Sequence, residues 1–168
     1  MSASATYEDE IGIFVLTLGG PGPLEPERLT PDRPGESFVA PSWSPDGTQV
    51  AYQHLGKGDA RPKIYVMNAD GTQARLVAVD AATPVWSPDG TEMAISNTET
   101  SHRGFAIVSL TDELAPRQYV TTVPENVPEE YPVWSPDGQR LAFNSHRTGA
   151  AAMPMCGWST VTAPTSLI

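Results

Sequence analysis

Cysteine and positive charge are both scarce in this sequence. Cys156 is the only cysteine among 168 residues, which excludes an internal disulfide and a cluster of thiolate metal ligands. Lys and Arg number 10 against 20 Asp and Glu, so the formal net charge is −10. An acidic surface repels a phosphate backbone, and we therefore expect no nucleic-acid partner.

Long apolar runs are missing as well. No stretch approaches the roughly 20 apolar residues of a membrane-spanning helix, so we expect no membrane span. Residues 1–10 lack the basic and apolar regions of a signal peptide, and we expect this N-terminus to be disordered. As written, the sequence predicts a cytoplasmic protein, but the compartment of any parent protein stays unknown.

Proline and glycine, by contrast, are abundant. The chain has 17 Pro and 14 Gly, which interrupt it every few residues. That frequency disfavours long helices and is typical of many short strands joined by turns.

The pentapeptide Trp-Ser-Pro-Asp-Gly occurs three times. Its copies are separated by 43 and 48 residues, close to the roughly 40–45 residues of a four-stranded propeller blade. We assign these residues a structural role and no catalytic, cofactor-binding or metal-binding one. They are Trp43, Ser44, Pro45, Asp46, Gly47, Trp86, Ser87, Pro88, Asp89, Gly90, Trp134, Ser135, Pro136, Asp137 and Gly138.

The chemistry of a tight turn accounts for this pentapeptide. Proline presets φ for the second turn position, aspartate caps the turn, and glycine takes the left-handed conformation. Each copy is followed by a small residue between two bulky ones, as in Val50-Ala51-Tyr52. Bulky and small side chains therefore alternate on a sheet that is buried on both faces. We predict that all three tryptophans are buried between sheets.

These units predict an all-β fold, an incomplete β-propeller of about three blades of four-stranded antiparallel sheets. Residues 11–36 match only the last two strands of the unit, and residues 124–149 only the first two. Complete blades are expected at residues 37–80 and 81–123.

An incomplete ring leaves blade faces open. We expect Ile13 and Val15 on the face at one end, and Leu141 and Phe143 on the face at the other. Apolar patches of that kind are rarely tolerated by monomers, so we predict self-association through the exposed blade faces.

The repeat resembles a known family. Pro-x-Trp-Ser-Pro-Asp-Gly, the apolar-Ala-apolar triplet and Ile64-Tyr65-Val66 together resemble the WD40-like repeat of TolB-type β-propellers, over residues 11–149. The resemblance implies a binding scaffold: TolB itself is a periplasmic protein that engages partner proteins. Similar propellers also precede the catalytic domain of prolyl-oligopeptidase-like peptidases.

From these features we predict a non-enzymatic, bacterial propeller fragment that serves as a scaffold for a protein or peptide partner, with no cofactor. One alternative is part of the gating propeller of a prolyl-oligopeptidase-like serine peptidase, although the sequence contains no Gly-x-Ser-x-Gly elbow. Another alternative is a nonfunctional gene fragment.

The histidines and turn aspartates are weak candidates for chemistry. His54, His102 and His146 each follow a second strand, and residues repeated from blade to blade are spread around a ring. Metal ligands must converge, so we expect no shared metal site. The three turn aspartates are explained by their turns.

The repeat pattern stops after Gly149. We expect residues 150–168, rich in Ala, Thr and Pro, to form a disordered tail that adds no third strand to the last blade. Triplets that bridge adjacent codons permit Val-Trp-Val-Val-Asp-Gly-Asp-Gly-Thr, which parallels residues 64–72. We interpret the tail as frameshifted near residue 150; the alternative is a naturally disordered tail.

Overall fold

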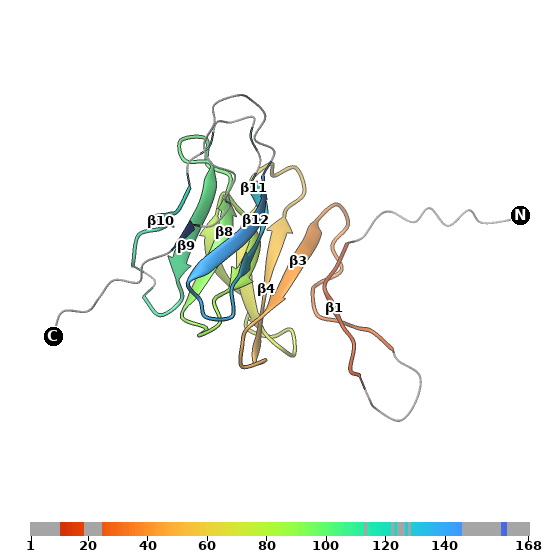
Figure 1. Cartoon of the computed structure of the whole chain (residues 1–168). Coiled ribbons are helices and arrows are strands. Elements are labelled where there is room, and N and C mark those ends of the chain that lie inside the picture. Colours follow the sequence, from red (N-terminus) through yellow and green to blue (C-terminus); the bar gives the residue numbers. More distant parts are fainter. Residues whose placement is uncertain are drawn as a thin grey trace, which may run out of the picture.

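The computed structural model describes residues 11–18, 25–112, 114–121, 123, 127 and 129–145, and the backbone of residues 159–160. Every regular element in these residues is a β-strand, which confirms the predicted all-β fold (Figure 1). The strands are β1 (Phe14–Val15), β2 (Glu27–Arg28), β3 (Ser37–Trp43), β4 (Gln49–Leu55), β5 (Lys63–Asn68), β6 (Arg75–Val79), β7 (Ala81–Trp86), β8 (Glu92–Asn97), β9 (Gly104–Ser109), β10 (Gln118–Tyr119), β11 (Glu129–Trp134), β12 (Arg140–Ser145) and β13 (Ser159–Thr160).

The strands form four antiparallel sheets in chain order. Two are four-stranded, β3-β4-β5-β6 and β7-β8-β9-β10, and they are flanked by the pair β1-β2 and by β11-β12-β13. The first strands of successive sheets lie side by side, because β7 contacts both β3 and β11. In Figure 1, β1 and β10 mark opposite sides of this stack.

The pentapeptide turn joins the first two strands at one fixed register in three of the four sheets, all but the pair β1-β2. Trp43 pairs with Val50, Trp86 with Met93, and Trp134 with Leu141. The glycine of each turn has a positive φ, between 69° and 75°. The same local chemistry thus starts the same hairpin three times.

A bulge interrupts the first strand of each of the three sheets that carry the motif, just before the motif. Ala40, Thr83 and Tyr131 occupy it with φ of 53°, 45° and 56°, each immediately before a proline. Proline has no N–H to donate to the ladder, and a bulge is where a sheet tolerates it. The regular alternation expected from the sequence did not include this bulge.

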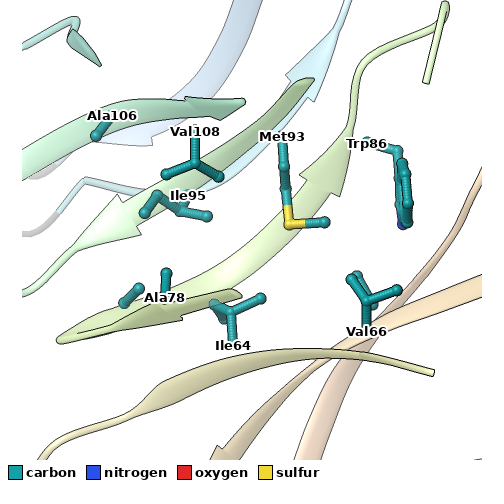
Figure 2. Packing of buried hydrophobic residues seen from close by; sticks show 10 residues of the cluster. Ile64, Val66, Ala78, Trp86, Met93, Ile95, Ala106 and Val108 are labelled. Atoms are coloured by element: carbon teal, nitrogen blue, oxygen red, sulfur yellow. The ribbon is translucent and has the colours of Figure 1, made fainter. Parts of the chain in front are cut away.

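Three apolar clusters fill the junctions between successive sheets. The central cluster joins the two complete sheets; in Figure 2 Val66 and Ile64 face Trp86 and Met93 across it. The cluster members are Ala51, Ile64, Val66, Ala78, Ala81, Trp86, Met93, Ile95, Ala106 and Val108. The apolar groups removed from water there stabilise the stack.

The two faces of sheet β7–β10 carry different side chains toward the preceding and the following sheet. Met93 and Ile95 pack in the central cluster, whereas Ala94 packs against Trp134 and Leu141 of the following sheet. The cluster at the first junction contains no alanine, so the packing of bulky side chains against small ones is a feature of the other two junctions.

The packing at the junctions corrects the faces expected to be open. Leu141 is buried against the preceding sheet and Ile13 against the following one, so neither lies on an open face. Phe143 contacts Phe105 of the preceding sheet. The expectation was wrong because alternation defines two faces of a strand without telling which face meets a neighbour.

The expected disorder of residues 1–10 lies outside the described residues, as does that of residues 150–158 and 161–168. Ser159 and Thr160, however, form β13 and pair with Leu141 and Arg140 of β12. The expectation that the tail adds no third strand is therefore wrong at these two residues. Backbone pairing at an open strand edge does not require a particular side chain, which the sequence pattern did not take into account.

Candidate functional site

The three Ser-Pro-Asp-Gly turns share one hydrogen-bond network. In the first turn the Ser44 hydroxyl donates to Asp46 Oδ1 at 2.6 Å and accepts from the Gln49 amide at 2.9 Å. The Thr48 amide and hydroxyl donate to the same carboxylate oxygen, at 3.0 and 2.9 Å. These bonds, that from Ser44 first, hold the pKa of Asp46 below its ordinary value of 3.8.

The second and third turns repeat this arrangement. Ser87 and Ser135 donate to Asp89 and Asp137, whose pKa values are lowered for the same reason. In the third turn Gln139 supplies only its backbone amide. Each carboxylate is engaged within its own turn.

The three motif tryptophans have different environments. Trp86 and Trp134 are buried, at 7% and 9% exposure, but Trp43 is 49% exposed. The predicted burial of Trp43 is wrong. Trp134 packs on β7 of the preceding sheet, whereas β1 and β2, which precede β3, provide no such first strand for Trp43.

The junction contacts show what Trp43 lacks. The Trp134 indole N–H donates to the Val85 carbonyl at 3.2 Å, and the Trp86 amide donates to the Ser42 hydroxyl at 3.4 Å. The Trp86 indole nitrogen is buried and has no hydrogen-bond partner among the described residues. Trp86 and Trp134 thus each lie against the residue that precedes the tryptophan of the previous sheet.

The two histidines that the structure describes, His54 and His102, have different partners. His54 Nε2 lies 2.8 Å from Glu36 Oε2, and its ring stacks on Phe38 at 4.7 Å between centroids. His102 stacks on Tyr119 at 4.5 Å, and His146 lies outside the described residues. In the part of the chain that the structure describes, no three His, Cys, Asp or Glu side chains gather in a way that could hold a metal ion.

A pocket of about 200 Å³ lies between the segment after β2 and the first complete sheet. Its walls are mostly aromatic and aliphatic, with Arg33 and His54 among the polar groups. The lining residues are Leu29, Thr30, Pro31, Arg33, Phe38, Tyr52, His54, Tyr65, Met67, Gly71 and Ala74. Sequence reasoning missed this pocket because it depends on contacts between segments far apart in the chain.

The pocket combines an aromatic floor with a charged rim. Tyr52 and Tyr65 stack at 5.9 Å between ring centroids, and burial, with Tyr65 nearby, raises the pKa of Tyr52 above its ordinary value. Tyr52 therefore stays neutral at physiological pH. The lining residues His54 and Arg33 both pair with Glu36, Arg33 at 3.7 Å. The pocket can enclose an apolar or aromatic group while its rim contacts polar ones.

Successive antiparallel sheets that pack face to face and repeat one motif define a β-propeller, and the described residues form part of one. The chain belongs to the TolB β-propeller family: the family model for the TolB beta propeller domain matches residues 5–160. This match confirms the resemblance found in the sequence. No curated protein sequence matches the chain.

Solved structures show the same fold. A putative TolB from Agrobacterium tumefaciens superposes with a TM-score of 0.60 at 21% identity, over 77% of this chain and 44% of that one. TolB from Acinetobacter baumannii gives 0.58 at 21% identity, over 74% and 30%. The β-propeller domain of the Trilobed protease from Pyrococcus furiosus gives 0.50 at 21% identity, over 64% and 34%. This chain thus spans less than half the length of these relatives.

Among the residues that the structure describes, none belongs to a helix long and apolar enough to traverse a bilayer.

Proposed function

We propose that this chain is a non-catalytic propeller scaffold that binds a protein or peptide partner. The observation that carries the proposal is the aromatic pocket between the segment after β2 and the sheet β3–β6. Propellers expose such hollows where sheets meet, and membership of the TolB family agrees with a binding role.

The size and lining of the pocket favour a peptide side chain as the occupant. Its volume of about 200 Å³ is smaller than the range of roughly 300–1,000 Å³ that is usual for small-molecule sites. Tyr65 is partly exposed and lies beside the buried Phe38 and Tyr52, and aromatic anchors in pockets often dominate the energy of protein interfaces. Arg33, which lines the pocket, can donate hydrogen bonds to the backbone carbonyls of a bound peptide.

The hydrogen bonds of the motif serines support a non-catalytic role. The serine hydroxyl of each motif is committed to its aspartate and to a backbone amide, as Ser44 is to Asp46 and Gln49. A nucleophilic serine needs a neighbouring base, and the only side chain that a motif serine contacts by hydrogen bond in these turns is its own aspartate.

The test uses a library of random linear peptides displayed on phage and selected on the whole chain. Peptides that are recovered are synthesised, and their affinity is measured by fluorescence anisotropy. We expect Tyr65→Ala to weaken binding at least about tenfold, or about 1.4 kcal/mol, because Tyr65 forms a wall of the pocket.

Tyr119→Ala is the matched control, since Tyr119 is an exposed tyrosine on β10, away from the pocket. It should leave the affinity unchanged. Recovery of no binding peptide, or of peptides whose affinity Tyr65→Ala does not alter, would contradict the proposal.

A further inference from the structure

Among the residues that the structure describes, two stretches of sheet surface lack a covering sheet: one on sheet β3–β6, beside the part packed on β1-β2, and one on sheet β11-β12-β13. On the first, which we call the Trp43 face, Trp43 is 49% exposed. On the last, which we call the Val133 face, Tyr131 is 61% and Val133 59% exposed, although both lie within strand β11. Large apolar side chains on adjacent strand positions mark an interaction surface.

The two faces are the two sides of a junction that the chain already makes twice. Trp86 lies against Ser42, and Trp134 against Val85. The partner in each case is the residue before the tryptophan of the preceding sheet. Val133 is the third residue in this series and lies on an open face. Trp43 is the tryptophan that lacks a preceding partner.

The end sheets complement each other strand by strand. The segment Ile13-Phe14-Val15 matches Ile64-Tyr65-Val66, which lies in the third strand of a complete sheet. β1 pairs with β2 as β5 pairs with β6, so the pair β1-β2 corresponds to the outer half of a sheet. β11 and β12 correspond to the inner half, since they carry the motif turn.

We propose that two copies of the chain join head to tail, with Trp43 of each copy against Val133 of the other. In this arrangement β1-β2 of one copy extends β11-β12 of the other into a four-stranded sheet. Two complete sheets and two halves in each copy then give a ring of six sheets, within the roughly four to eight blades of known propellers. The dimer is two-fold symmetric: Trp43 of the first copy contacts Val133 of the second, Val133 of the first contacts Trp43 of the second, and these two contacts close the ring.

The position of β13 bears directly on this arrangement. Ser159 and Thr160 pair with β12 along the edge that β1 of the second copy would take. When the ring forms, β12 of each copy therefore loses its pairing with the two-residue strand β13 and gains the pair β1-β2 of the other copy, which already packs on sheet β3–β6 of that copy. The formal charge of −10 per copy opposes the association, so added salt strengthens it.

The inference is independent of the proposed peptide binding, because neither Trp43 nor Val133 lines the aromatic pocket. Sedimentation velocity of the whole chain, over a series of micromolar concentrations, tests it. We expect a species of twice the mass of the chain, and we expect Trp43→Glu and Val133→Glu each to yield monomers. Both side chains are largely exposed within a single copy, so both variants should fold, which circular dichroism checks.

Leu76→Glu is the matched control. Leu76 is 49% exposed, as Trp43 is, but it lies on the outer strand β6. This variant should associate like the unchanged chain. A monomeric unchanged chain, or dissociation by Leu76→Glu to the same extent, would overturn the proposal.

Mixing the two monomeric variants distinguishes a contact of Trp43 with Val133 from a contact of Trp43 with Trp43. The Val133→Glu chain keeps Trp43 and the Trp43→Glu chain keeps Val133, so the mixture retains one intact junction and should form a 1:1 dimer. A mixture that stays monomeric would contradict the head-to-tail arrangement. So would a Val133→Glu variant that dimerises by itself, since that result indicates a contact of Trp43 with Trp43.

Discussion

Two junctions of the molecule contain the same motif but differ in packing. One lies between the two complete sheets, and the other lies between β1-β2 and β3–β6. In the first, Trp86 is 7% exposed and Met93 and Ile64 are fully enclosed. In the second, Trp43 is 49% exposed while Phe38 and Tyr52 border a pocket. The motif determines the turn, and the preceding sheet determines whether the tryptophan is buried.

The largest expected difference between the two junctions is in the cost of removing the tryptophan. Trp86→Ala should lower the free energy of unfolding by about 3–5 kcal/mol, because it empties a closed core. Trp43→Ala should cost less than about 1 kcal/mol in a dilute, monomeric sample, as for other exposed sites. Urea unfolding followed by circular dichroism measures both values.

Equal losses for the two variants would contradict the comparison. They would mean that Trp43 is as enclosed as Trp86 in the single copy.

A smaller effect is expected from two glycines with the same backbone conformation. Gly71 and Gly47 have φ of 81° and 71°. A Cβ at Gly71 would lie 2.8 Å from the Leu29 carbonyl oxygen of the first junction, whereas one at Gly47 would meet nothing within 4 Å. Gly47→Ala should therefore cost only the left-handed strain, about 1–2 kcal/mol.

Gly71→Ala should cost about 1–3 kcal/mol more than that, because the backbone of the segment after β2 must move. Thermal unfolding of the two variants side by side provides the measurement. If the two melting temperatures are equal, the segment after β2 does not pack against the turn at Gly71 as described.

The smallest effect concerns the acid stability of the motif turns. The pKa values of Asp46, Asp89 and Asp137 are lowered from 3.8 in the folded chain. A lowered folded pKa means that these carboxylates contribute stability above the unfolded value, and that the contribution is lost as the pH falls through the folded pKa. The free energy of unfolding should therefore decrease as the pH is lowered past about 4.

A variant in which Asp46, Asp89 and Asp137 are all replaced by Asn keeps an acceptor oxygen in each turn but has no carboxylate there to titrate. Its unfolding free energy should be lower at neutral pH and should approach that of the unchanged chain in acid. Parallel pH profiles for the two proteins would show that the turns do not titrate as described.

Much of the fold could be predicted from the sequence because its signals are local. Pro, Asp and Gly in the motif turn fix the hairpin, so strands such as β4 and β8 follow directly from the alternation after the turn. The family resemblance rested on the same local residues, and the family match confirms it.

What could not be predicted depends on neighbours in space. The exposure of Trp43 depends on which strands precede it, and the burial of Leu141 depends on which face meets the previous sheet. The only sign of the bulge at Thr83 in the sequence is the proline that follows it. The pocket needs Leu29 and Tyr65 to meet across the first junction, which no local pattern indicates.

Hydrogen–deuterium exchange of the whole chain, in a dilute and monomeric sample, tests most directly whether sheets are stabilised by the sheets on either side. Amides of β8 and β9, which lie between two neighbouring sheets, should exchange slowest, and those of β1 and β2 should exchange fastest among the strands. Uniform protection along the chain, or β1 and β2 protected as strongly as β8, would contradict this account.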